Sequence, residues 1–187
     1  MNLEKFLRSL EQKPVIAAVS DDKWAAALHS PATVLFYLSA DVMTVRDRIA
    51  EAHAVGKAVL VHADLAEGIG KDAAGIRYLA DCGADGILST RAALIRAAKE
   101  HGLIAVQRFF ALDSKGLDSV EEMLHKTSPH LMEIMPGVIG KAIRRFSVGE
   151  IPVIAGGLVE TADEVEGAFA NGATAVSTGA EDLWRRS

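Results

Sequence analysis

The sequence predicts an α/β fold, a small TIM-type (β/α)8 barrel with short or missing helices, on two observations. Eight short apolar runs rich in β-branched residues recur along the chain, which is typical of parallel strands buried on both faces. Helical patterns separate these runs, and an alternation of strands and helices favours a parallel sheet. Eight strands can close into a barrel, and the alternative is an open, doubly wound sheet.

The eight expected strands are short and nearly continuously apolar. In chain order they are Pro14–Ser20, Thr33–Ser39, Lys57–Leu65, Asp85–Thr90, Leu103–Phe110, His130–Gly137, Ile151–Gly157 and Thr174–Gly179. Barrels of this class usually need about 250 residues, and this chain has 187. The helices must therefore be short, or one is missing. The chain contains no linker-like or low-complexity stretch, so residues 1–187 are expected to form a single barrel domain.

Helical periodicity and capping signals fill most of the intervals between the strands. Val42–Val55 places its apolar residues on one stripe and ends at Gly56. Thr161 and Glu164 have the spacing of a capping box. The other expected helices are Met1–Gln12, Thr90–His101, Ser114–Thr127, Val138–Val148 and the short Glu181–Arg186. The first of these is expected to cover the bottom of the barrel.

Composition limits the classes of function. The chain is 50% hydrophobic and carries a formal net charge of −5, which argues against a general binder of nucleic acid or membrane surfaces. No apolar run approaches the ~18 residues of a membrane span. The single cysteine, Cys82, excludes an intramolecular disulfide framework and is typical of a reducing compartment. We therefore expect a cytoplasmic protein with no membrane partner. A homo-oligomer is compatible with the sequence.

One phrase occurs twice, about half a chain apart. GADGILST runs from Gly83 to Thr90, and GATAVST runs from Gly172 to Thr178. In a barrel, the two copies would occupy the fourth and eighth strands, on opposite sides. Each would place a Ser-Thr pair at the carboxyl end of its strand. Duplication of a half-barrel and convergence on one packing solution both explain the repeat.

Active and binding sites of such barrels lie at the carboxyl ends of the strands, and the loops after strands seven and eight often bind phosphate. Here the seventh strand ends in Gly156-Gly157, and the eighth ends in Ser177-Thr178-Gly179 before a short helix. Glycine lets the backbone approach an anion closely, and a helix N-terminus adds partial positive charge. The sequence thus predicts a phosphate site here, although Gly-Gly also fits a simple turn.

Several polar residues near the other strand ends are candidates for the mouth of the barrel. They are His62, Asp64, Arg91, Gln107, Arg108 and Glu133. His62 and Asp64 alternate along a strand, so their side chains would share a face. They could act as acid and base or hold a ligand, or they could form a polar network in the core. Arg108 and Glu133 could form a structural ion pair or an anion clamp. These residues form no dense cluster of metal ligands, so we expect no metal and no cofactor.

Basic residues gather on one expected helix. Lys141 and Arg145 are one turn apart on Val138–Val148, and Arg144 lies beside them. Such a run is commonly a solvated helix face. It is also the best local basic surface that this acidic chain offers to RNA phosphates.

The motifs considered together resemble a known family. VHADLAEGIGKD, DGILSTR, AVQRFFALDS, EIMPGVI and IPVIAGGLVETADEVEGAFANGATAVST are similar in sequence and order to those of the glycerol uptake operon antiterminator family. The resemblance extends from about Lys57 to Trp184. One departure is Gly179, where the family often has a hydroxyl-bearing residue.

The resemblance implies a barrel that binds glycerol-3-phosphate as an effector and acts on the leader mRNA of glycerol genes to prevent termination. It implies a regulator, with no catalytic residues. Two alternatives stay open. One is an isomerase or lyase acting on a small sugar phosphate, with His62 or Asp64 as base and Glu133 as acid; no lysine is expected at a strand tip for Schiff-base chemistry. The other is a ligand-binding barrel that acts through a protein partner.

Overall fold

Eight parallel strands form a closed barrel in sequence order, and the pairing of the first strand with the last closes it. The computed structural model describes residues 1–111 and 114–186. The strands are β1 (Val15–Val19), β2 (Val34–Tyr37), β3 (Ala58–His62), β4 (Gly86–Ser89), β5 (Ile104–Phe110), β6 (Leu131–Met135), β7 (Val153–Gly156) and β8 (Ala175–Thr178). The barrel expected from the sequence is confirmed, and the open sheet is excluded.

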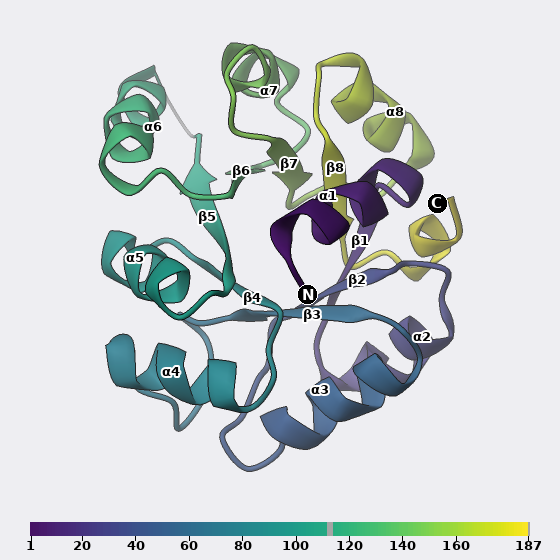
Figure 1. The fold of residues 1–187 in the computed structure, drawn as a ribbon. Coiled ribbons are helices and arrows are strands. Elements are labelled where there is room, and N and C mark those ends of the chain that lie inside the picture. The colour runs from purple at the N-terminus through teal and green to yellow at the C-terminus, as the bar shows by residue number, and fades with distance from the viewer. Residues whose placement is uncertain (112–113, 187) are drawn as a thin grey trace.

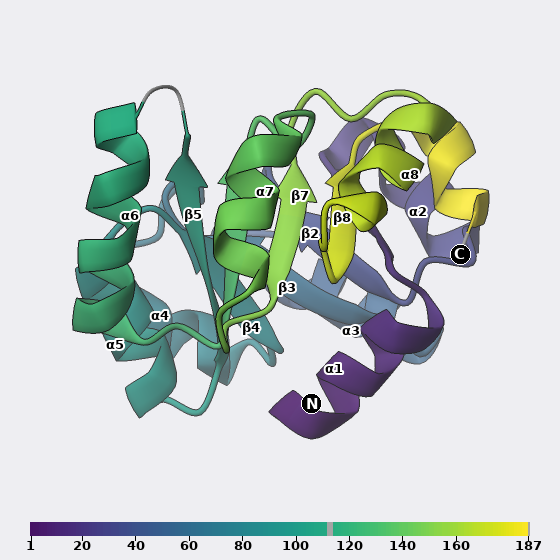
Figure 2. The same cartoon turned by 90° about the horizontal axis from the view of Figure 1, so that it is seen from above.

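Helices surround the barrel, as Figures 1 and 2 show. They are α1 (Leu3–Gln12), α2 (Trp24–His29), α3 (Val45–Ala54), α4 (Ala73–Asp81), α5 (Ala92–Glu100), α6 (Ser114–Thr127), α7 (Gly140–Ser147) and α8 (Ala162–Ala170), with 3-10 helices η1 (Asp21–Lys23) and η2 (Glu181–Arg186). No connection of the expected barrel lacks a helix. The small size is reached with helices of 6 to 14 residues and strands of 4 to 7.

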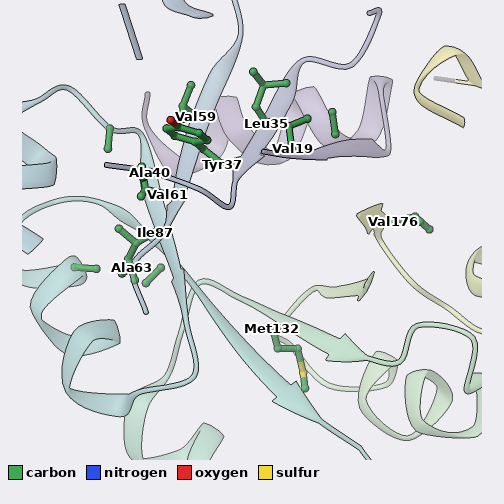
Figure 3. Packing of buried hydrophobic residues seen from close by; sticks show 14 of the residues in the cluster. Val19, Leu35, Tyr37, Ala40, Val59, Val61, Ala63, Ile87, Met132 and Val176 are labelled. Carbon is green, nitrogen blue, oxygen red and sulfur yellow. The ribbon is translucent and has the colours of Figure 1, made fainter. Parts of the chain in front are cut away.

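Alternation along each strand divides the core into two layers. The outer layer lies between the strands and the surrounding helices and includes Val59, Val61 and Met132 (Figure 3). The inner layer fills the barrel and includes Ile16, Phe36 and other residues of the strands. A residue's place in this alternation therefore decides whether its side chain can reach the mouth.

Helix α1 closes the amino-terminal end of the barrel, as the sequence predicted. It lies across that end in Figure 1. Phe6 and Leu10 are fully buried and pack against the inner layer. Asn2 caps the helix by accepting a hydrogen bond from the amide of Lys5. Helix α1 thus covers the interior at the end of the barrel opposite the carboxyl ends of the strands.

Several boundaries differ from the expected ones. Strand β3 ends at His62 rather than Leu65, and α3 begins at Val45 rather than Val42. The capping box at Thr161 and Glu164 is present as expected. Within the described residues, no helix has the length and apolar character needed to cross a membrane.

Candidate ligand-binding site at the carboxyl ends of the strands

A cavity of about 570 Å³ opens at the carboxyl ends of the strands. Its walls come from β1, β5, β6 and β8 and from the segments that follow β1, β2, β7 and β8. The lining residues that have polar side chains or no side chain are Lys23, Arg108, Glu133, Gly157, Glu160, Ser177, Thr178 and Gly179. The structure therefore brings the two glycine-containing strand ends and two of the expected mouth residues to one cavity.

Glycines at the end of β7 allow a close approach that other residues would prevent. A Cβ atom at Gly156 would overlap the Glu133 carboxylate and lie 2.6 Å from Ser177 Oγ. Gly157 has φ +73°, in the left-handed region that favours glycine. Leu158 follows with φ +59° and is exposed. The Gly-Gly pair is thus a turn, and Gly157 is also part of the cavity wall.

Ser177 and Thr178 point in opposite directions at the end of β8. Ser177 faces the interior and donates a hydrogen bond to Glu133 Oε1 at 2.6 Å. The Thr178 hydroxyl donates to the Val159 carbonyl at 2.6 Å and accepts from the amide of Ala180. The Thr178 hydroxyl, which we expected to contact phosphate, is therefore occupied within the fold.

The two copies of the repeated phrase are not equivalent residue for residue. Both copies form strands on opposite sides of the barrel, as expected. However, the second copy has one residue fewer between its glycine and its serine, and a shift of one residue reverses the face of a strand side chain. Ser89 consequently matches Thr178: each hydroxyl accepts from the amide two residues later, Arg91 and Ala180 respectively.

Arg108, Glu133 and Ser177 form one buried network from three strands. Arg108 Nε lies 2.5 Å from Glu133 Oε2, and the two side chains are 11% and 1% exposed. Adjacent pairing of β5 and β6 places these two residues opposite each other. The ion pair anticipated from the sequence is therefore present, and it also forms part of the cavity wall.

His62 ends β3 and is buried beside this network. Its pKa is lowered, first by burial and second by the charge of Arg108. Within the described part of the chain, His62 Nδ1 has no hydrogen-bond partner. A neutral imidazole with an unpaired nitrogen is suited to a ligand hydroxyl. However, His62 is not among the residues that line the cavity as it stands.

Asp64 does not lie on the strand with His62, contrary to the expectation from sequence. It lies in a turn after β3. Its carboxylate accepts from the Ser89 hydroxyl at 2.8 Å and from the Thr90 amide at 2.7 Å. Arg91 Nε is 3.4 Å from the same carboxylate. Asp64 and Arg91 thus join the β3 and β4 loops, and neither lines the cavity.

Gln107 is a second correction. It faces outward, where its Oε1 accepts a hydrogen bond from the Thr127 hydroxyl of α6 at 2.5 Å. Because successive side chains of a strand alternate, an inward Arg108 requires an outward Gln107. The alternation itself could have shown that only one of the two residues reaches the mouth.

Lys23 is a cavity residue that the sequence reading missed. It belongs to η1, directly after β1, and its Nζ donates to the Gly179 carbonyl at 2.8 Å. Lys23 lies four residues beyond the end of β1, so it does not contradict the expectation that no lysine lies at a strand tip, but it does bring an ammonium to the cavity. The sequence SDDK at the end of the first apolar run was the signal from which this lysine could have been found.

The basic residues of α7 are not equally available. Arg145 is held by two carboxylates of α6, Asp118 at 2.8 Å and Glu121 at 2.9 Å. Lys141 and Arg144 are exposed. The proposed basic face is thereby reduced to these two side chains. Among residues 1–111 and 114–186, no group of three or more His, Cys, Asp or Glu side chains is placed to hold a metal ion.

Comparison with known proteins decides the family. The family model described as "Glycerol-3-phosphate responsive antiterminator" matches residues 15–184. The chain belongs to this family. The match also covers the first strands, over which the resemblance in sequence is less specific.

Three similar proteins match nearly the whole chain, and the names of two of them describe antiterminators. The crystal structure of a glycerol uptake operon antiterminator regulatory protein from Listeria monocytogenes is 35% identical, with a TM-score of 0.88 and coverage of 94% of this chain and 96% of that one. An antiterminator-related protein from Thermotoga maritima is 32% identical, with a TM-score of 0.84 and coverage of 92% and 98%. YgcP of Escherichia coli is 31% identical, and the match covers 95% of both chains.

Solved aldolases share only the fold with this chain. A deoxyribose-phosphate aldolase from Coccidioides immitis, for example, is 12% identical with a TM-score of 0.73. That likeness confirms the TIM-type barrel, and it says nothing about chemistry. The cavity residues must therefore be interpreted through the antiterminator family and their own geometry.

Proposed function

We propose that this chain is a regulator that binds glycerol-3-phosphate in the cavity at the strand ends and, in response, binds leader mRNA and prevents transcription termination. The observation that carries the proposal is the junction of β7 and β8. There, in a member of this family, a cavity of about 570 Å³ is lined by Gly157, Ser177 and Gly179. The volume falls within the usual range for small-molecule sites.

The phosphate is proposed to lie against the backbone of Gly157 and Gly179, while the absence of a side chain at Gly156 makes room for Glu133 and Ser177 behind them. Loops after the seventh and eighth strands are the usual phosphate site of such barrels. The structure also supports different roles for the glycines and for Thr178. The glycines present backbone, and Thr178 holds the loop through its bond to Val159.

The glycerol hydroxyls are proposed to contact Arg108 and Glu133, which line the same cavity. A buried carboxylate accepts, and a guanidinium donates, so the pair can bind both ends of a hydroxyl dipole. His62 Nδ1, which is buried and unpartnered among the described residues, is proposed as a further partner for a ligand hydroxyl. A ligand without hydroxyls would leave His62 Nδ1 unpaired and would lack the contacts to Arg108 and Glu133, so it should bind more weakly.

The RNA contact is proposed for Lys141 and Arg144 of α7, which are exposed. RNA phosphates are bound mainly by such cations, and each adds to the salt dependence of affinity. With two cations, the logarithm of the binding constant should fall with the logarithm of salt concentration with a slope of about −1.4 for single-stranded RNA.

The test is binding of fluorescent leader RNA of glycerol genes, with and without glycerol-3-phosphate. The account predicts tighter binding with the ligand and its loss in the Lys141→Glu/Arg144→Glu variant. A matched control is Arg77→Glu/Arg96→Glu, which reverses two exposed cations of α4 and α5. RNA affinity that is the same with and without glycerol-3-phosphate would contradict the proposal. An equal loss of RNA affinity in the two double variants would also contradict it. Recovery of a protein partner with no RNA would favour a protein-mediated output.

A further inference from the structure

We infer that Lys23 is the cation that neutralises the ligand phosphate. This assignment rests on the proposed function, because it concerns the same cavity. It adds a residue from the loop after β1 to a site otherwise built from β5 to β8. The site would then bridge the seam at which the first and last strands close the barrel.

Position is the first argument. Lys23 lines the cavity together with Gly157 and Gly179, and its ammonium is 2.8 Å from the Gly179 carbonyl. It therefore lies at the end of β8, where the glycine backbone is bare. An ammonium has three N–H donors. One is directed at Gly179, so two are left for the oxygens of a phosphate.

Charge is the second argument. Four charged side chains line the cavity: Lys23, Arg108, Glu133 and Glu160. Arg108 and Glu133 neutralise each other at 2.5 Å. Glu160 is exposed at the rim, where water screens its charge. Lys23 is thus the cavity cation that has no carboxylate partner among the described residues, and its one recorded bond is to a neutral carbonyl.

A half-buried position makes this charge effective. Lys23 is neither fully exposed nor fully buried, so a phosphate beside it would be partly shielded from water and would interact more strongly than at the surface. Lysine is a common phosphate binder and acts there as a point charge. Its flexible stem also permits small shifts of the ammonium as the ligand enters.

The experiment is calorimetric titration of the full chain with glycerol-3-phosphate and with inorganic phosphate, at 50 and 500 mM NaCl. Lys23→Met is expected to weaken binding of glycerol-3-phosphate 10- to 100-fold at low salt. The matched control is Lys71→Met. Lys71 is also a rim lysine that donates to a backbone carbonyl, that of Ala66, but it does not line the cavity. Its loss should change affinity less than twofold.

A second variant and a second readout separate binding from folding. Lys23→Gln keeps an N–H donor toward Gly179 and removes the charge, so it should lose affinity as Lys23→Met does. Both variants should also lose part of the salt dependence of binding, which a merely structural role would leave unchanged.

The outcomes distinguish the two proposals. Wild-type binding with unchanged affinity in Lys23→Met and Lys23→Gln would overturn the assignment of Lys23 and leave the proposed function standing. Binding of inorganic phosphate without binding of glycerol-3-phosphate would overturn the proposed function, and the same variants titrated with phosphate would then decide the role of Lys23. No binding of either ligand would overturn both.

Discussion

Glu133 connects the polar side chains inside the mouth of the barrel. It is fully buried and joins Arg108 of β5 to Ser177 of β8. Because side chains alternate along β6, an inward position of Glu133 could be predicted from the sequence. The bond to Ser177 was not readable, because it depends on the register between strands that are far apart in the chain.

Removing one partner of a buried ion pair should cost far more stability than removing both. Glu133→Leu leaves Arg108 without its carboxylate and is expected to lower the free energy of unfolding by about 3–5 kcal/mol. The double variant Glu133→Leu/Arg108→Met should lose much less than the sum of the single variants. Urea unfolding measures each value, with the exposed Glu160→Gln as control. Additive losses would show that the two charges do not act as a pair.

Burial of His62 should make stability depend on pH. Its pKa is lowered in the folded state by burial and by Arg108. Above about pH 6.5 the imidazole is neutral in both states; below it, the unfolded chain takes up a proton that the folded chain does not. The free energy of unfolding should therefore fall with pH below 6.5, by at most about 1.4 kcal/mol per unit from this residue.

Urea unfolding at pH 7.5 and 5.5 checks this dependence, and His62→Gln should reduce the difference between the two values. The half-buried His130, whose pKa is lowered by burial and by Lys99, contributes in the same direction and stays in the variant. The exposed His101→Gln is the control. A pH difference that is equal in wild type and His62→Gln would refute the role of His62.

At the scale of elements, strands were more predictable than their ends and than short helices. All eight strands follow from apolar runs. Helix α2 has only six residues, and Gly75 lies inside α4, so neither has a strong helical pattern. Gly75 is required by tertiary contact, because a Cβ there would overlap the carbonyl of Gly70. Asp64 was misplaced because β3 ends at His62, three residues earlier than its apolar run suggested.

Helix α1 should stabilise the barrel without taking part in ligand binding. Phe6→Ala removes a fully buried ring from the inner layer and is expected to cost about 3–5 kcal/mol of unfolding free energy. The affinity for glycerol-3-phosphate should stay unchanged, since α1 lies at the opposite end of the barrel (Figure 2). The exposed Lys5→Ala is the control. A loss below 1 kcal/mol would show that α1 does not complete the core.

At the scale of the whole molecule, closure of the barrel creates the candidate site. Lys23 follows β1, and Gly179 follows β8, and they meet because these strands pair. The glycine-rich strand ends could be located from the sequence because they are local motifs. The contact between Lys23 and Gly179 could not, because it joins residues 156 positions apart. The excess of acidic residues across the chain further implies that any RNA contact is local and sensitive to salt.

The most direct test of the central claim is calorimetric titration of wild type, Gly179→Asp and Gly179→Asn with glycerol-3-phosphate. Gly179 is suitable because an added Cβ would have only ordinary contact with the Ala18 carbonyl, at 3.6 Å. The account predicts that wild type binds glycerol-3-phosphate more tightly than phosphate or glycerol. Gly179→Asp should abolish binding through its negative charge, while the nearly isosteric Gly179→Asn keeps most of it. Equal binding by wild type and Gly179→Asp would contradict a phosphate site at the end of β8.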